Sequence, residues 1–470
     1  MKQIRLTGND PPVMTVRLHD FSFGLDTSTA EGLLPDGAAV AMDHVCVEDR
    51  TLKTAKGITP INEFYSMGFA VRSLMTFDKE GERQVLAVLD NGQLWDMATY
   101  NQPFLFMNDF GAAPTSSIWY QNRGKEVLLF GNATGGVWHW DGSRLRAILE
   151  APKPNAMILH KERVWILPAD DPMAVQCCRD MNPEDWSQSL DAGALIRILT
   201  WDGTRCIGLK SVFEDVIVAK ERSLWRISGS DPTNFQLSPV YSGRGAIANR
   251  SLAVCDGGMA FLSEDGVFFY DGVRCRALQS ARIKGIMQGM NPRLRHTAAG
   301  VFFKDKYYLS FAMGESRHND TVLCYHFGTG SWTVRHGVCV NDWAVAGDQL
   351  LCGMQEGYVA EYESGETILG TPYRGQWTGA LRGLDGMAVQ KTLQSVTLTA
   401  RGQGTLHLRW QFDQSRERQV SVTLTPDWRT RTLQLDGTGK MVRFGITGGV
   451  GSTFEVADAA FDLRVVPCAL

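Results

Sequence analysis

The sequence lacks the long apolar segments that direct a chain into or across a membrane. No run of apolar residues approaches the roughly 18 that a membrane-spanning helix needs. The first residues, Met1 to Gly8, begin with charge and lack the apolar stretch of a secretory signal peptide. We therefore expect a soluble protein that is made in the cytoplasm and has no membrane partner.

Neither sign of charge dominates the sequence. Lysine and arginine total 47 against 51 acidic residues, which gives a net charge of −4. Such a balance provides no global basic surface for holding DNA or an anionic membrane, so any contact with nucleic acid should be local or non-adhesive. Hydrophobic residues make up 44% and charged residues 21% of the 470 residues, as in ordinary globular proteins.

The cysteines and histidines form no pattern that is typical of a metal site or a disulfide framework. There are ten cysteines, with one adjacent pair at Cys177 and Cys178 and no C-x-x-C. We expect free, buried thiols in a reducing compartment. The histidines, among them His139, His326 and His336, show no spacing that suits zinc, and we predict no metal site.

The local signatures of common enzymes are also missing. No G-x-S-x-G, H-E-x-x-H or Walker loop occurs in the chain. Residues 242–248 (SGRGAIA) contain G-x-G-x-x-A, but the residues that follow suggest a strand and not the helix that a dinucleotide site requires. We predict no catalytic residues and no cofactor, and we interpret the protein as a non-enzyme.

Acidic loop residues leave one enzymatic alternative open, that of a glycosidase. Asp170, Asp171, Glu184 and Asp185 could place carboxylates around the centre of a ring-shaped fold, and glycosidases need two of them close together. Turn formation is the simpler interpretation of these acids. Asp170 and Asp171 also lack the D-x-[DN]-x-[DN]-G ladder of a calcium loop.

A repeated hairpin pattern is present along the middle of the chain. A short apolar strand, a polar turn and a strand with an aromatic residue recur around Trp95, Trp138, Trp225, Phe268 and Tyr358. These positions are spaced by 43, 87, 43 and 90 residues, so each interval is one or two periods of about 43. A period of roughly 40 to 50 residues is typical of a four-stranded β-propeller blade.

The repeat predicts an all-β fold with a propeller of about six or seven blades. Degenerate copies near residues 175 and 325 fill the double intervals. The five repeated aromatic residues are then structural anchors of the blades, because a repeated core needs a repeated aromatic residue. Closing the blades into a ring buries their apolar faces and protects their edges.

The composition also suggests where the repeat begins and ends. Residues 1–60 carry turn formers and no blade pattern, and we expect an extended N-terminal arm that partly contributes to ring closure. The propeller should span residues 61–368, with a helical insertion near residues 277–295. Residues 369–470 alternate polar and apolar positions between glycine-rich turns, which favours a separate C-terminal β-sandwich.

Several of these features together resemble one family. The segment GRGAIANRSLAVCDGGMAFLSEDGVFFYDG (residues 243–272) is similar to a blade of bacteriophage propeller proteins that starts with G-x-I-A-x-x-S. The Lys56–Ile58 turn, the Pro183–Trp186 blade end and the sandwich after the ring agree with it. Together they resemble the packaged-DNA stabilisation protein, also called tail hub or nozzle, of short-tailed phages.

This resemblance implies a structural virion protein of the phage neck or tail, assembled in the host cytoplasm. The family forms a hexameric ring of propellers below the portal and adaptor, and the ring retains packaged DNA and lets it pass on ejection. It has no active site to transfer, and this chain departs from it in having no basic cluster. A carbohydrate-binding or glycan-cleaving propeller with a lectin-like appendage, and a general protein-interaction propeller, remain alternatives.

Overall fold

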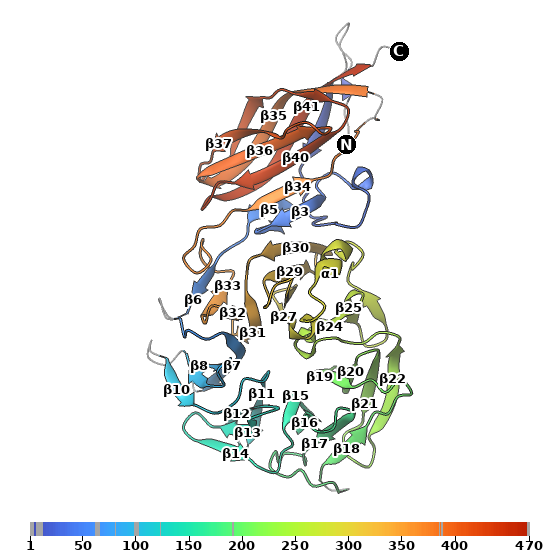
Figure 1. The fold of residues 1–470 in the computed structure, drawn as a ribbon, viewed down its shortest axis with the longest axis vertical. Helices are drawn as coiled ribbons and strands as arrows, with labels where there is room; N and C mark the ends of the chain where they lie inside the picture. Colours follow the sequence, from blue (N-terminus) through green and yellow to red (C-terminus); the bar gives the residue numbers. More distant parts are fainter. Residues whose placement is uncertain are drawn as a thin grey trace.

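The computed structural model describes residues 4–5, 13–61, 66–79, 81–97, 103–122, 124–189, 192–384, 386 and 389–467. In these residues the chain forms strands and turns, with a single short α-helix, α1 (Lys284–Gly289). The prediction of an all-β protein with a propeller is confirmed. Figure 1 shows a ring of small sheets in the lower part of the molecule and two larger sheets above it.

Seven four-stranded antiparallel sheets follow one another along the described part of the chain. The first three are β7 (Val71–Lys79), β8 (Glu82–Leu89), β9 (Leu94–Asp96) and β10 (Phe104–Met107); β11 (Ser116–Asn122), β12 (Lys125–Asn132), β13 (Gly136–Trp140) and β14 (Leu145–Ile148); and β15 (Pro154–His160), β16 (Arg163–Pro168), β17 (Ala174–Cys177) and β18 (Ala194–Arg197). The next three are β19 (Cys206–Val212), β20 (Asp215–Lys220), β21 (Ser223–Ser228) and β22 (Gln236–Ser242); β23 (Ala253–Cys255), β24 (Gly258–Ser263), β25 (Gly266–Tyr270) and β26 (Cys275–Ala277); and β27 (Ala299–Phe303), β28 (Lys306–Phe311), β29 (Thr321–His326) and β30 (Ser331–His336). The last consists of β31 (Val340–Ala346), β32 (Gln349–Met354), β33 (Val359–Tyr362) and β6 (Ile58–Pro60).

Hydrophobic side chains fill each space between neighbouring sheets, in a separate cluster at six of the seven interfaces and, between the fifth and sixth sheets, in a core shared with the larger sheets. Leu128 and Phe130 of the second sheet, for example, pack against Met75 and Phe77 of the first. Ala344 of the last sheet packs in the same way against the first sheet, so the ring is closed by side chains as well as by strands. Burial on both faces explains why central strands such as β24 and β25 are apolar at nearly every position.

The last sheet is completed by a strand from the beginning of the chain. Strand β6 pairs antiparallel with β33, and Ile58 is fully buried between the sixth and seventh sheets. Gly57, just before β6, exchanges backbone hydrogen bonds with the segment after β33: its N–H donates to Gly365 O, and Ser364 N–H donates to Gly57 O. The ring is therefore closed by residues about 300 positions apart in sequence.

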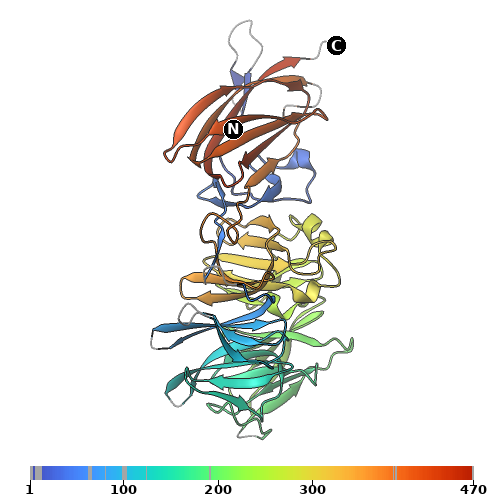
Figure 2. The same ribbon diagram turned by 60° about the vertical axis from the view of Figure 1, so that its left-hand side comes forward.

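Two larger sheets lie above the ring and contain strands from both ends of the chain (Figure 2). One has eight described strands, namely β1 (Ile4–Arg5), β2 (Val13–Leu18), β41 (Thr453–Pro467), β35 (Val389–Gln403) and β38 (Arg429–Gln434), with β39 (Thr438–Gly439), β4 (Val45–Glu48) and β5 (Thr51–Thr54) attached at the sides. The other has five, in the order β3 (Ala39–Asp43), β34 (Gln376–Gly379), β40 (Val442–Gly448), β36 (Thr405–Phe412) and β37 (Arg418–Thr423).

The N-terminal residues thus differ from the extended arm that the sequence suggested. Strand β2 pairs along β41, β3 pairs with β34, and β5 pairs with β41, so residues 13–54 are built into the C-terminal sheets. Ion pairs join the same segments, as between Arg17 and Asp458 (2.6 Å) and between Arg443 and Glu31 (2.5 Å). The turn formers at residues 8–12 (GNDPP) lie outside the described residues.

One hydrophobic core connects the two larger sheets with the ring. Phe21 and Trp377 meet edge to face at 5.4 Å between ring centroids, and both are buried. The same core includes Trp332 of the sixth ring sheet, whose indole N–H donates to Leu278 O. Because this core is continuous, the larger sheets and the ring are packed as one body and not linked by a free segment.

The expected helical insertion near residues 277–295 is much shorter in the structure. Helix α1 has six residues, β26 extends to Ala277, and a 3₁₀ turn, η4 (Arg295–Thr297), follows later. The helical spacing of the apolar residues does reflect burial, because Ile286 and Met287 are buried. Gln279 adopts a positive φ of 47°, and Gly285 and Gly289 are poor helix formers, so the helix does not extend further.

A buried histidine lies where β4 and β3 meet the sixth ring sheet. His44 is 8% exposed, with Asp43, Arg335, His336 and Tyr373 around it. Its ring lies 5.1 Å from that of Tyr373, and its Nδ1 accepts a hydrogen bond from Arg335 Nε at 3.3 Å. Burial, with the nearby positive charge of Arg335, lowers the pKa of His44 to about 4 although Asp43 opposes the shift.

This histidine should make the fold sensitive to mild acid. Because its pKa is lowered on folding, the unfolded chain binds more protons between about pH 6.5 and pH 4, and stability falls as the pH decreases through that window. His44 has a φ of 50°, which asparagine tolerates, so His44→Asn is the suitable variant. We expect urea titrations to show that, from pH 7 to pH 5, the free energy of unfolding falls by about 1–2 kcal/mol less in His44→Asn than in the wild type. The exposed His19→Asn is the control and should behave as the wild type; equal losses in all three proteins would contradict this prediction.

Candidate functional site

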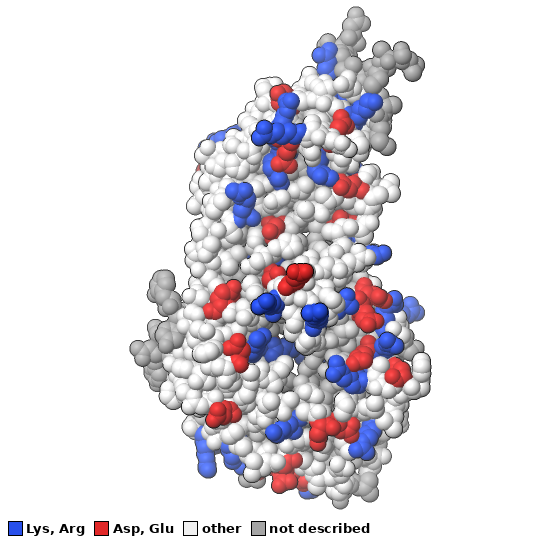
Figure 3. Space-filling model, in the orientation of Figure 1, with Lys and Arg blue, Asp and Glu red and all other residues white. Residues whose placement is uncertain are grey.

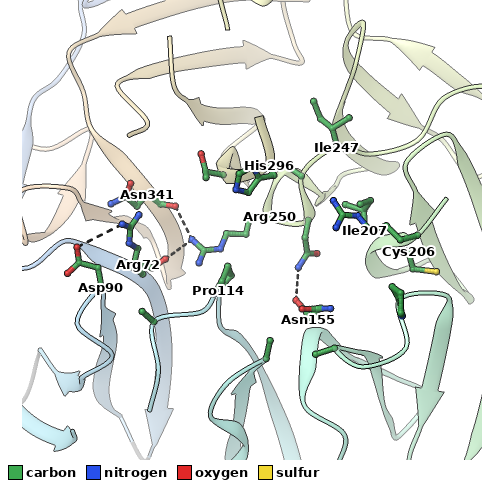
Figure 4. Close-up of a pocket in the computed structure, with 18 residues that line it drawn as sticks. Arg72, Asp90, Pro114, Asn155, Cys206, Ile207, Ile247, Arg250, His296 and Asn341 are labelled. Carbon is green, nitrogen blue, oxygen red and sulfur yellow. Dashed lines mark hydrogen bonds and ion pairs between the residues drawn. The ribbon is translucent and has the colours of Figure 1, made fainter. Parts of the chain in front are cut away.

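A large cavity lies at the centre of the ring. Its volume is about 650 Å³, within the range of roughly 300–1,000 Å³ that is common for ligand pockets. It is lined by the first residues of the innermost strands and by the loops beside them, such as Arg72, Pro114, Asn155, Cys206 and Asn341. The cavity therefore opens on the face of the ring where the innermost strands begin (Figure 4).

One short turn crosses the centre and forms the floor of the cavity. It is the 3₁₀ turn η3 (Asn249–Ser251), which precedes the fifth sheet. Arg250 Nη1 donates to Arg72 O at 2.5 Å and to Asn341 O at 3.0 Å, and its Nη2 donates to Ser73 Oγ at 2.8 Å. This one guanidinium thus ties the fifth sheet to the first and the seventh, across the axis of the ring.

The neighbour of Arg250 makes a contact in another direction. Asn249 Nδ2 donates to Asn155 O, at the start of the third sheet, at 3.0 Å. Together the two side chains of the turn reach three other sheets across the centre of the ring. The centre is therefore bridged by hydrogen bonds at this level.

The charges of the cavity are mixed and largely paired. Of the described residues that line it, Asp90 is the only acid, and it lies 3.9 Å from Arg72. Arg205, at the rim, pairs with Glu221 at 2.8 Å. With one carboxylate in its lining, the cavity lacks the pair of carboxylates on which most glycosidases depend.

Arg250 is also part of a buried ionic group beneath the cavity. Its Nη1 lies 3.7 Å from Asp342 Oδ1, and the two side chains are 17% and 14% exposed. Asp342 Oδ2 accepts the backbone N–H of Leu74 at 2.9 Å. Burial raises the pKa of Asp342 even though Arg250 opposes the shift, and burial lowers the pKa of Lys210 nearby. The group joins the first, fifth and seventh sheets electrostatically.

The structure explains the motif G-x-I-A-x-x-S by the shape of this turn. A Cβ on Gly245 would lie 1.9 Å from Lys220 O, so only glycine fits beside the fourth sheet. Ala248 is buried, and its carbonyl accepts a hydrogen bond from Ser251 Oγ, which also accepts the backbone N–H of Leu262. These residues hold the turn so that Arg250 points across the ring. Sequence reasoning missed Arg250, because it stands at a variable position of the motif.

The five predicted anchors have equivalent positions in their sheets. Trp95, Trp138, Trp225 and Phe268 lie in the third strands β9, β13, β21 and β25, and Tyr358 directly precedes β33. Phe268 is buried, whereas the three tryptophans and Tyr358 are partly buried at the margins of the clusters between sheets. The tryptophan N–H groups bond within their own hairpins, as from Trp138 to Gly135 O at 2.8 Å. None of the five lines the central cavity.

The acidic loop residues considered for a glycosidase are not brought together at the centre. Asp171 pairs with Arg197, Glu184 with Arg146, and Asp185 with Arg179. Asp185 Oδ1 also accepts the N–H and the hydroxyl of Ser187, which is a typical turn interaction. In the described part of the chain, no group of three or more His, Cys, Asp or Glu side chains is arranged to hold a metal ion.

The nine cysteines among the described residues are free, including the adjacent Cys177 and Cys178, which are both buried. Burial raises the pKa of Cys178 to about 12, so its thiol is a poor nucleophile. In the residues described, no helix is long and apolar enough to span a membrane.

Comparison with known proteins gives likenesses of fold only. No protein-family model matches the chain, and no curated protein matches it. Among solved structures, the designed protein Ika8 is 13% identical and gives a TM-score of 0.40 over 65% of this chain and 99% of its own. BamB from Moraxella catarrhalis is 11% identical, with a TM-score of 0.39 over 68% and 93%. BBS1N, in a complex with ARL6DN, is 10% identical, with a TM-score of 0.43 over 66% and 97%. Such scores at such identities say nothing about what this chain binds or does.

Proposed function

We propose that the chain is a structural protein of the neck or tail of a short-tailed phage particle. In this proposal the seven ring sheets are the blades of one propeller, and the two larger sheets form a sandwich on top of it. Several copies, six by the resemblance of the sequence, form a ring below the portal and adaptor. The ring retains packaged DNA and passes it on ejection.

The observation that carries this proposal is the turn that crosses the centre of the propeller. Because Asn249 and Arg250 cross the axis, a DNA duplex has no path through the chain itself. A conduit for DNA must then lie between copies, with each propeller forming part of its wall. This requirement agrees with a homo-oligomer and assigns the centre of each propeller a structural role.

The interleaved ends of the chain support a role under mechanical load. Strand β41 pairs with β2 and β5 from the N-terminal region, and β6 closes the ring. Pulling the larger sheets away from the ring would require opening their shared core, and it would pull on the short segment between β5 and the closing strand β6. Such a connection suits a protein that resists the pressure of packaged DNA.

The surface charge supports passage of DNA without adhesion. On the face drawn in Figure 3, Lys and Arg side chains alternate with Asp and Glu over both parts of the molecule. Among the described residues many charged side chains form ion pairs, as between Arg244 and Asp265 (2.8 Å). A mixed surface with a net charge of −4 would not grip phosphates strongly, so DNA could move past it.

A second candidate function is carbohydrate binding, which the size and polar lining of the central cavity favour. Hydrolysis is less well supported, because Asp90 is the single carboxylate in the described lining. A glycan array with the purified chain tests this candidate. Binding that is lost in Asn155→Leu, at the cavity wall, would favour it over the structural role.

The structural proposal is tested with particles produced by a host that carries the gene. We expect mass spectrometry of purified particles to find the chain at several copies per portal. Particles made after disruption of the gene should fill with DNA but lose it, so that a nuclease degrades their genomes. Particles that lack the chain, or that keep nuclease-resistant DNA without it, would contradict the proposal.

A further inference from the structure

A second, much smaller cavity lies at the junction between the ring and the N-terminal hairpin β4–β5. Its volume is about 30 Å³, which is roughly twice the 10–15 Å³ that one water molecule needs. Residues of β4 and of the sixth ring sheet line it, together with Tyr362 and Glu363. It thus lies where the larger sheets meet the propeller, far in sequence from the central turn.

Two cationic side chains line this cavity, and only one of them has a carboxylate partner. Lys306 Nζ lies 3.2 Å from Glu363 Oε1, which also accepts the hydroxyl of Tyr308 at 2.8 Å. Arg335 is 6% exposed and has no carboxylate within ion-pair distance in the described residues. Its Nε donates to His44, while Nη1 and Nη2 are buried and donate to none of the described residues.

The remaining groups around Arg335 do not supply the missing negative charge. Burial raises the pKa of Cys46 to about 12 and that of Cys324 to about 12, so both thiols remain neutral. His44 is neutral above about pH 4. Tyr362 and Tyr373 face the guanidinium with their rings, at 5.1 and 5.7 Å from the ring centroids, and provide a weaker attraction than a carboxylate.

The junction therefore contains the buried Arg335 and the partly buried Lys306, and the partly exposed Glu363 is the one carboxylate in the described lining of the cavity. Leaving a buried charge uncompensated is costly, and leaving its N–H groups without acceptors adds to that cost. Water could accept the hydrogen bonds but would not balance the charge. A small anion would do both, and the volume is sufficient for a single halide but too small for phosphate or a carboxylic acid.

We propose that this junction cavity binds one monovalent inorganic anion of the size of chloride, held by Arg335 and Lys306. The weakly polar thiols of Cys46 and Cys324 complete its lining. The anion connects residues of the sixth ring sheet with the β4–β5 hairpin, so it stabilises the attachment of the larger sheets to the propeller. This site is independent of the proposed role in a phage particle.

Bromide identifies the site directly, because its anomalous scattering distinguishes it from water. Crystals of the full chain grown or soaked in sodium bromide should show one anomalous peak in the cavity, within about 3.5 Å of Arg335 nitrogen atoms. Density without an anomalous signal would show that water occupies the cavity, and it would overturn the proposal.

Thermal unfolding provides a second and independent readout. In sodium chloride the unfolding temperature should exceed that in sodium gluconate of equal ionic strength by about 1–4 °C, and the difference should saturate with concentration. Arg335→Met should abolish the difference, whereas Arg418→Met, an exposed arginine paired with Asp436, should retain it. If Arg335→Met does not fold, Lys306→Met serves in its place. Equal unfolding temperatures of the wild type in both salts would also overturn the proposal.

Discussion

Replacement of Arg250 by methionine is expected to lower the free energy of unfolding by about 3–5 kcal/mol. The variant removes the donor to Arg72 O, Asn341 O and Ser73 Oγ, and all three acceptors lie at the centre of the ring. It also removes the guanidinium beside Asp342, which leaves Lys210 as the remaining nearby cation. Removing one partner of a buried ion pair is costly because the other charge stays buried. Urea unfolding followed by tryptophan fluorescence measures the effect.

Two further variants test whether the loss of stability comes from the Arg250 guanidinium itself or from any substitution of an arginine in the cavity. Arg205→Met removes another arginine of the same cavity, whose exposed ion pair with Glu221 should contribute less than about 1 kcal/mol. Arg250→Lys keeps the charge but cannot reach all three acceptors, so its loss should be intermediate. If Arg250→Met is no less stable than Arg205→Met, the central turn does not hold the ring together.

Replacement of Gly57 by alanine should have the second large effect, of about 2–4 kcal/mol. A Cβ at this position would lie 2.1 Å from Thr367 O and 2.7 Å from Thr367 N, and backbone atoms cannot move aside as a flexible side chain can. Gly57 is also fixed by hydrogen bonds with Gly365 and Ser364. Relief of the clash would displace β6 from β33, so hydrogen exchange at β33 should increase as well.

A matched control for this substitution is Gly32→Ala. A Cβ on Gly32 would meet no atom within 4 Å, and its backbone does not need a positive φ. Its stability should stay within about 0.5 kcal/mol of the wild type. Similar stabilities of Gly57→Ala and Gly32→Ala would show that the closing strand does not depend on this close approach.

The ring was predictable because its cause is periodic. Each sheet packs against the next through apolar and aromatic side chains of corresponding strands. Aromatic residues therefore recur at intervals of about 43 residues, as at Trp95 and Trp138. The larger C-terminal sheets were indicated by alternation, which is visible in strands such as β36. Such patterns can be recognised in the sequence because they result from the burial of residues that are close together along the chain.

The pairing of the N-terminal strands was not predictable in this way. Val16 faces Phe461 across a strand pair that joins residues more than 440 positions apart. Nothing in the six residues of β2 specifies which strand they join, since any apolar edge could accept them. The expected contribution of the N-terminal region to ring closure is found in β6, although nothing in its three residues specifies that they pair with β33.

The candidate site was largely invisible to sequence reasoning. The central cavity is formed by loops from nearly every sheet, and loops carry no period. Arg250 gave no signal of its own, because a single arginine in a turn is ordinarily a solvated residue. The false dinucleotide motif at residues 242–248 arose from Gly245, which is required by close packing against Lys220 O and not by a phosphate.

Electron cryomicroscopy of the purified full chain shows whether its copies assemble around a conduit for DNA. We expect a closed ring of several copies, with an open lumen between the propellers and with Arg250 crossing the centre of each propeller. Monomers at every protein concentration, or a ring without a lumen wide enough for duplex DNA, would contradict the account.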